Sequence, residues 1–151
     1  QLLGDCCAPN PSTINKFKID AWEKESIIEY LGTTTDVRPM IANADCVVLP
    51  SYREGIPRTL LEAAAMAKPL ITTDVPGCRD VVINNKTGFI CKVKDEKSLA
   101  DACKKMFTLS HQERVNMGYE GRAFITKKFD EQIIINQYIK TLEKYKNISH
   151  E

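Results

Sequence analysis

The sequence predicts an α/β fold, in which a parallel sheet carries helices on both faces and is followed by C-terminal helices. Short apolar runs of four or five residues alternate with amphipathic stretches. Such alternation is typical of parallel strands joined by helices, because strands buried on both faces read as continuous apolar runs. In the last third of the chain, three amphipathic stretches follow one another, which predicts terminal helices.

The strands are expected where the apolar runs occur. Proline and glycine punctuate these runs, since neither residue continues a regular strand easily. In chain order, the expected strands are a remnant at Leu2-Leu3 and the runs 27–31, 46–49, 70–73 and 88–91.

The clearest helix is expected at 57–67. Pro57 suits the first helical position, where an absent N–H costs nothing. The core stripe of this helix consists of Leu60, Leu61, Ala64 and Ala65. The other expected helices are 13–24, with Phe17, Ala21 and Trp22 on one side, then 37–44, a helical turn at 79–83, 97–109, 112–127 and 131–145.

Length and charge exclude several classes of protein. With 151 residues, 43% of them hydrophobic, the chain is expected to form one domain, residues 1–151. Its 21 basic and 20 acidic residues leave a net charge of +1, whereas nucleic-acid binding usually needs a basic excess. Nucleic acid is therefore not an expected partner, although a small anion such as a diphosphate needs only a local pocket.

The cysteines and histidines argue against a metal site. No Cys-x-x-Cys pair occurs among the six cysteines, and only His111 and His150 could assist, so zinc is not expected. Cys46, Cys91 and Cys103 sit in apolar runs and are expected in the core. Reduced thiols, and no apolar run near the ~20 residues that span a membrane, predict a cytoplasmic protein.

Three loops are expected at the edge of the sheet where ligands bind. In parallel α/β sheets, this edge is formed by the carboxyl ends of the strands. The three loops are rich in Gly, Pro, Thr or Asp and span 32–36, 50–57 and 74–77. The loop 50–57 has the most residues of the kinds that bind ligands.

The segment 51–63 joins a strand, a loop and a helix N-terminus. Free N–H groups and the helix dipole attract anions to such an N-terminus. Gly55 allows a ligand to approach the backbone closely. The N–H groups of Arg58, Thr59 and Leu60 are candidates to donate hydrogen bonds to a phosphate.

Two carboxylates flank this anion site, Glu54 in the loop and Glu62 in the helix. An ionised carboxylate has two acceptor oxygens and therefore suits paired sugar hydroxyls. The pattern predicts a phosphate group with a sugar on each side. Two simpler interpretations stay open: Glu54 as a surface acid, and Glu62 as an i,i+4 partner of Arg58. Arg53 and Arg58 also fit ordinary solvated charges.

The spacing of Glu54 and Glu62 is an E-x7-E motif, and the chain resembles the family 4 retaining glycosyltransferases. Those enzymes have the GT-B fold, whose C-terminal half is a Rossmann-like, donor-binding domain. The resemblance extends from about Leu2 to Tyr145. The segments that carry it, in family order, are ADCVVLPS at 44–51, AAAM at 63–66, TDVPGCRDVV at 73–82, TGF at 87–89 and MG at 117–118.

The resemblance implies a role for each matching position. Glu54 would touch hydroxyls of the transferred sugar near the reacting carbon, Glu62 would hold the ribose, and Thr34 would meet the base edge. The donor-binding backbone would comprise Gly55, Ile56, Pro57, Arg58, Thr59 and Leu60. The implied reaction is retaining transfer of a hexose or N-acetylhexosamine from a UDP-sugar to a glycan or lipid-linked acceptor, without a metal or other cofactor.

The amino-acid sequence of residues 54–62 is similar to that of enzymes that extend polyprenyl-diphosphate-linked oligosaccharides. This similarity implies a bacterial polysaccharide pathway, a membrane-linked acceptor and a place at the inner membrane face. The family's first strand–helix unit, with its basic diphosphate clamp, and its acceptor-binding N-terminal domain would precede Gln1. The domain is therefore expected to be incomplete at that edge and inactive alone, with a terminal helix at about 129–146 packing toward the N-terminal domain.

The chain departs from the family pattern at two positions, and two other functions remain open. Many relatives have glycine where this chain has Pro57, and glycine before Lys-Pro where it has Ala67. The alternatives are a different α/β nucleotide-binding domain, such as a dinucleotide module, and a non-catalytic interaction domain. Against the first, the chain has neither Gly-x-Gly-x-x-Gly nor Gly-x-x-x-x-Gly-Lys-Ser/Thr.

Overall fold

A computed structural model describes residues 1–6 and 13–148, and the chain forms two compact units, 1–39 and 40–151. Cys7 and His150 lie outside the described residues, and the prediction of one domain over 1–151 stays a prediction.

The first unit contains helix α1 (Lys16–Lys24) and a parallel bridge between Leu2 and Tyr30. The side chain of Asn15 caps α1 by accepting the N–H of Lys18 at 3.3 Å. The strand predicted at 27–31 is reduced to this bridge, because Leu2 is the only described segment that pairs with it.

The buried residue of α1 is not among the three, Phe17, Ala21 and Trp22, that the sequence grouped on one side. Ile19 is the buried residue of this helix, whereas Phe17 is 84% exposed and Ala21 is exposed as well. Two residues correspond to about 200° around a helix, so burying Ile19 turns Phe17 and Ala21 outward.

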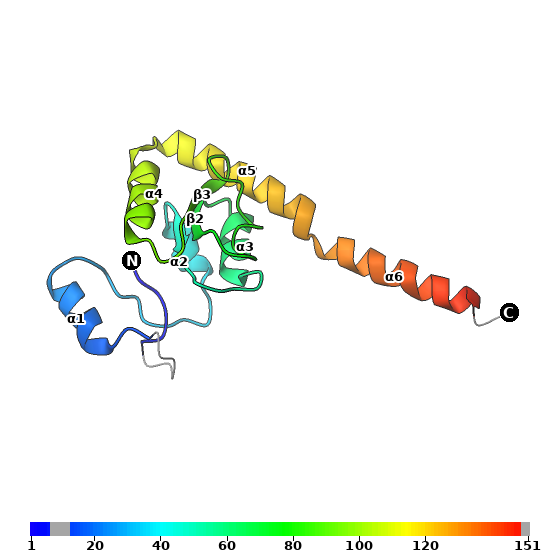
Figure 1. The fold of residues 1–151 in the computed structure, drawn as a ribbon, viewed down its shortest axis with the longest axis horizontal. Coiled ribbons are helices and arrows are strands. Elements are labelled where there is room, and N and C mark those ends of the chain that lie inside the picture. The colour runs from blue at the N-terminus through cyan, green and yellow to red at the C-terminus, as the bar shows by residue number, and fades with distance from the viewer. Residues whose placement is uncertain (7–12, 149–151) are drawn as a thin grey trace. The chain divides into compact units, whose positions relative to one another are not determined.

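The second unit is built on a three-stranded parallel sheet in the order β1-β2-β3 (Figure 1). Strands β1 (Val47–Leu49), β2 (Leu70–Thr73) and β3 (Gly88–Cys91) match three of the predicted runs to within a residue. Their register places Val48, Ile71 and Phe89 side by side.

Helices cover both faces of this sheet, as predicted. Helix α4 (Glu96–Thr108) packs against Ile71 and Phe89, in a core that includes Met106 and Met117. Helix α3 (Arg58–Ala65) lies on the other side of the sheet (Figure 1). The buried residues of α3 are Leu60, Ala63 and Ala64, so the predicted stripe is wrong at Ala65, which is exposed.

Three further helices complete the described chain. Helix α5 begins at a capping box in which Ser110 and Glu113 satisfy each other's backbone N–H groups, and it packs against α3. Side chains 131–145 of α6 are all exposed, and the packing of this helix toward an N-terminal domain stays a prediction. The bounds are α2 (Arg38–Asn43), α5 (His111–Phe129) and α6 (Glu131–Ile148).

The predicted helical turn at 79–83 begins earlier in the structure. The N–H of Arg79 donates to the carbonyl of Val75 at 3.0 Å, which closes a single turn. Among residues 1–6 and 13–148, no helix has the length and apolar composition to cross a membrane.

The expected burial of three cysteines is confirmed for Cys91, which is 2% exposed. Cys46 and Cys103 are half-buried and line an apolar groove of about 470 Å³ beside β1, together with Met106 and Phe107. Burial, with a smaller contribution from nearby Cys103, raises the pKa of the Cys46 thiol to about 12.

This shift predicts a pH dependence of stability. Above pH 9 the Cys46 thiol ionises in the unfolded chain but stays protonated in the folded chain until about pH 12. The unfolded state therefore binds fewer protons, and the free energy of unfolding falls by about 1.4 kcal/mol per pH unit in this window. We expect urea unfolding between pH 9 and 10.5 to show a steeper fall for the wild type than for Cys46→Ala. Equal slopes would contradict the burial of this thiol.

Candidate functional site

The loop between β1 and α3 is tied to the neighbouring strand β2 by two threonine hydroxyls. Thr72 Oγ1 donates to the carbonyl of Leu49 at 2.9 Å, and Thr73 Oγ1 donates to the carbonyl of Ser51. Both threonines are buried, with 0% and 2% of their surface exposed. A buried hydroxyl is costly unless it is hydrogen-bonded, so these contacts fix the start of the loop.

Glu54 is exposed in this loop and has one side-chain partner that the structure shows. Ser51 Oγ donates a hydrogen bond to Glu54 Oε1 at 2.9 Å. The buried Cys78 lies close enough for the Glu54 carboxylate to add to the rise of its pKa, of which burial is the larger cause. The carboxylate thus stands at the surface above a buried layer, and within the described residues its second oxygen has no hydrogen-bond partner.

The loop after β2 packs directly against the loop after β1, as the sequence predicted for strand ends of one sheet edge. Gly77 has a φ of +84°, and an added Cβ would lie 1.4 Å from the carbonyl oxygen of Gly55. Its N–H donates to Asp80 Oδ2 at 3.0 Å. The backbone of Glu54 and Gly55 is therefore in contact with a glycine that no other residue could replace without displacement.

The N-terminus of α3 differs from the prediction by one residue. Pro57 is the N-cap and not the first helical residue, because its backbone is extended, with φ −72° and ψ 121°. The N–H of Leu60 donates to the carbonyl of Pro57 at 3.1 Å, so the prediction that Leu60 offers this N–H to a phosphate is wrong. Arg58 and Thr59 keep their N–H groups in the first turn, where helical N–H groups lack partners within the helix.

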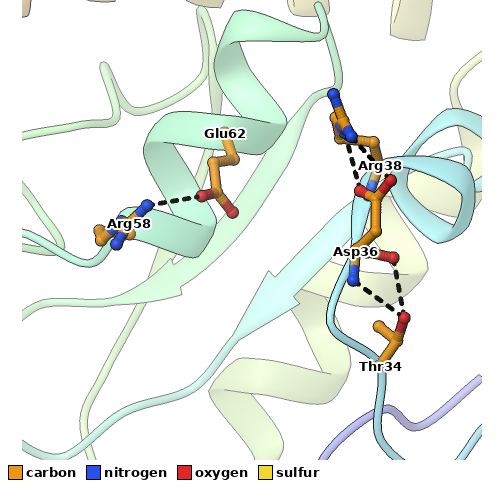
Figure 2. A network of polar contacts seen from close by, with 5 residues as sticks. All are labelled: Thr34, Asp36, Arg38, Arg58 and Glu62. Atoms are coloured by element: carbon orange, nitrogen blue, oxygen red, sulfur yellow. Dashed lines mark hydrogen bonds and ion pairs between the residues drawn. The ribbon is translucent and has the colours of Figure 1, made fainter.

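Glu62 lies one turn further along α3 and faces Arg58. The Arg58 Nη2 atom is 3.7 Å from Glu62 Oε1, and the two side chains are 91% and 40% exposed (Figure 2). This is the simpler alternative that the sequence left open. An ion pair this exposed contributes little to stability, typically 0–1 kcal/mol, so it does not prevent Glu62 from accepting a ligand.

Thr34 belongs to the first unit, in a separate network with Asp36 and Arg38 (Figure 2). Its hydroxyl donates to the carbonyl of Asp36 at 3.0 Å and accepts the N–H of Asp36 at 3.1 Å. The Arg38 guanidinium contacts both oxygens of the Asp36 carboxyl, at 2.8 and 2.9 Å, and lowers its pKa. In the predicted base loop, the Thr34 hydroxyl and the Asp36 carboxyl are thus already paired within the turn.

Basic groups near the strand ends were not predicted. Lys94 Nζ lies 5.5 Å from the centre of the Tyr52 ring, and Arg79 Nε pairs with Asp74 Oδ1 at 3.1 Å. The available signal was positional, since each of these residues follows closely on the carboxyl end of a strand. Within the described ranges, no three His, Cys, Asp or Glu side chains are grouped to hold a metal ion, and a metal-free reaction stays a prediction.

The residues that form this site lie within a match to a known protein family. Residues 16–124 match the family described as "Glycosyl transferases group 1". The chain belongs to this family. The match includes the strand, loop and helix that carry Glu54 and Glu62, and it confirms the resemblance that the sequence motifs indicated.

Similar proteins include glycosyltransferases of bacteria. The chain is 32% identical over 118 residues to the N,N'-diacetylbacillosaminyl-diphospho-undecaprenol alpha-1,3-N-acetylgalactosaminyltransferase of Campylobacter jejuni, covering 78% of this chain and 31% of that protein. It is 38% identical over 92 residues to the capsular polysaccharide biosynthesis glycosyltransferase CapM of Staphylococcus aureus, covering 61% and 24%. The chain thus spans about a third or less of these relatives.

Solved structures confirm the fold class. A glycosyltransferase from Rickettsia africae is 25% identical, with a TM-score of 0.78 over 97% of this chain and 38% of that one. Alr3699/HepE of Anabaena, solved in complex with UDP-glucose, is 21% identical, with a TM-score of 0.78 over 94% and 40%. The neighbours are glycosyltransferases of the GT-B type, and the α/β sheet of this chain has that fold.

Proposed function

We propose that this chain is the donor-binding part of a retaining glycosyltransferase that uses a UDP-sugar. The observation that carries the proposal is the short β1–α3 connection, which places Glu54 before a helix N-terminus and Glu62 one turn inside it. Anions bind at such N-termini, and carboxylates accept hydrogen bonds from sugar hydroxyls. A sugar diphosphate nucleoside combines these three groups in one molecule.

Each group then has a role. The diphosphate lies at the N–H groups of Arg58 and Thr59, where the helix dipole stabilises the charge of the leaving group without a metal. Glu54 accepts hydroxyls of the transferred hexose or N-acetylhexosamine, and Glu62 accepts the ribose hydroxyls. The backbone of Gly55 to Pro57 lies along the sugar and diphosphate, and the role of Thr34, which belongs to the other unit, at the base edge stays a prediction. Solved complexes of a structural neighbour with UDP and with UDP-glucose support a nucleotide sugar as the ligand.

The acceptor and the second domain also belong to the proposal. The Campylobacter relative is named for a diphospho-undecaprenol substrate, which supports a glycan or lipid-linked acceptor and work at the inner membrane face. Because the chain spans about a third of that relative, we propose that the acceptor-binding part lies in an N-terminal domain of the full enzyme. The chain alone is then expected to bind the donor without transferring the sugar.

The test is a calorimetric titration of this chain with UDP. We expect saturable binding that falls at least tenfold in Glu62→Gln, since hydrogen bonds to charged groups contribute about 1.5–3 kcal/mol. Arg58→Gln removes the ion pair and keeps the carboxylate, so it separates a ligand role of Glu62 from its pairing with Arg58. Glu143→Gln, on the exposed helix α6, is the matched control and should leave binding unchanged.

Two comparison ligands separate the alternatives. GDP tests the choice of base, and NAD tests a dinucleotide module. Binding of NAD in preference to UDP would favour the other α/β nucleotide binder, and no binding of any of the three would favour an interaction domain. Equal UDP affinity in Glu62→Gln and wild type would reject the ribose role.

A further inference from the structure

We infer that Thr73 and Gly77, on and after strand β2, are positioning residues that hold the Glu54 carboxylate in place for the sugar. The inference rests on the proposed function of Glu54. Neither residue belongs to the β1–α3 loop; both lie in the 73–82 segment of the resemblance, and the sequence placed Gly77 in a loop at the ligand edge without linking either residue to Glu54. Their contacts show that the position of Glu54 is set from the neighbouring strand.

The first contact begins at the Thr73 hydroxyl. Strand β1 ends at Leu49, which pairs with Thr72, and the chain then leaves the ladder. The buried Thr73 Oγ1 donates to the carbonyl of Ser51, two residues beyond the end of β1. A side-chain hydrogen bond thus continues the pairing of the two strands after their backbone pairing has stopped.

The second contact carries this position outward to the carboxylate. Ser51, whose carbonyl Thr73 holds, donates its own hydroxyl to Glu54 Oε1 at 2.9 Å. The path from the buried strand to the exposed carboxylate therefore contains two hydrogen bonds and one residue between them. The other oxygen of Glu54 is left for a ligand hydroxyl.

Gly77 supports the same loop from the other side. Its α-carbon packs so closely on the loop that a Cβ would lie 1.4 Å from the oxygen and 2.4 Å from the carbon of the Gly55 carbonyl. The N–H of Gly77 is in turn held by Asp80 Oδ2 at 3.0 Å. The turn at Gly77 thus prevents the backbone after Glu54 from moving toward β2, while the Thr73 hydroxyl holds the backbone before Glu54.

The consequence for binding is preorganisation. A carboxylate that is already in place loses less conformational freedom when the sugar binds, and the gain appears in affinity for the sugar portion of the donor. Thr73→Val removes the hydroxyl and nearly preserves the side-chain shape, whereas Thr73→Ser keeps the hydroxyl. These two variants separate the hydrogen bond from the packing.

The binding test compares UDP-glucose with UDP by calorimetry. We expect Thr73→Val to weaken UDP-glucose about fivefold to tenfold and UDP less than twofold, and Thr73→Ser to keep the wild-type difference between the ligands. In the Glu54→Gln background, Thr73→Val should have no further effect on UDP-glucose, because the carboxylate it positions is gone. Equal losses for both ligands, or a full additional loss in the Glu54→Gln background, would overturn the positioning role.

A second buried threonine provides the control. Thr87 is 1% exposed, and its hydroxyl accepts the N–H of Ile83 at 2.8 Å in the turn before β3. Thr87→Val should lower the free energy of unfolding without changing the ratio of the two affinities. A change of that ratio in Thr87→Val would mean that lost stability alone accounts for the effect of Thr73→Val, and would overturn the inference.

A measurement without ligand keeps the two proposals distinguishable. In ¹⁵N NMR spectra, Thr73→Val should shift the amide signals of residues 51–55 and speed their hydrogen exchange, whereas Thr73→Ser should not. These changes support the positioning role even if the wild type binds no UDP-glucose, in which case the proposed function fails. Unchanged amide signals at 51–55 in Thr73→Val would overturn the positioning role whatever the donor.

Discussion

Replacing Gly77 by alanine is expected to lower the free energy of unfolding by about 3 kcal/mol. The added Cβ would meet the carbonyl oxygen of Gly55 at 1.4 Å, and the φ of +84° is strained for any residue with a side chain. The three nearest atoms are all backbone atoms of Glu54 and Gly55, so no rotation of a flexible side chain relieves the clash. The loop from Glu54 to Pro57 must move, and we expect UDP-glucose binding to be lost with it.

Gly55 itself is the matched control for this substitution. No heavy atom lies within 4 Å of a Cβ added there, and its φ lies outside the left-handed region. Gly55→Ala should therefore change the free energy of unfolding by less than about 0.5 kcal/mol, but weaken the ligand that approaches this backbone. Urea unfolding and UDP-glucose titration of both variants check the pair. Wild-type stability of Gly77→Ala would show that the two loops do not touch in solution.

Two glycines of α5 should respond in opposite directions to alanine. At Gly118, a Cβ would lie 1.8 Å from the carbonyl oxygen of Ala67, at the end of α3. At Gly121, the nearest atom is the Cβ of Thr87 at 3.6 Å, an ordinary contact. We expect Gly118→Ala to lower the free energy of unfolding by about 2–3 kcal/mol through overpacking. Gly121→Ala should raise it by up to about 1 kcal/mol, because alanine favours the helix.

The difference follows from how α3 ends against α5. Ala67 has a φ of +56°, its N–H donates to Ala64, and the N–H of Lys68 donates to Ala63, which is a Schellman end. This end directs the Ala67 carbonyl at Gly118. Thermal and urea unfolding of the two variants, followed by circular dichroism, measure the effect. Similar stabilities of Gly118→Ala and Gly121→Ala would contradict the close approach of the helices.

Much of the fold could be predicted because local signals agree with the tertiary structure. Strand β2 begins after Pro69 and β3 begins at Gly88, and both lie where the apolar runs placed them. The run at 27–31 has the same local character, but among the described residues only Leu2 pairs with it, and there it forms a bridge. Strand formation depends on pairing, which a local pattern does not contain.

The candidate site could be predicted in outline and not in its contacts. Strand ends of one parallel edge meet, which correctly brought the 50–57 and 74–77 loops together. The pattern could not show that Leu60 gives its N–H to Pro57, because the N-cap differed by one residue. Nor could it show the hydrogen bond from Thr73 to Ser51, because the two residues lie 22 positions apart and only tertiary packing brings them together.

The contact of Ala67 with Gly118 also limits how the sequence of this domain can diverge. A larger residue at 118 is tolerable only if helix α3 ends at another residue, or if the chain after α3 runs in another direction. A glycine at 67 would relax the backbone there, but it would still direct a carbonyl at the same point of α5. Positions 67 and 118, 51 residues apart in the chain, are therefore expected to vary together, because a larger residue at 118 requires a change at the end of α3.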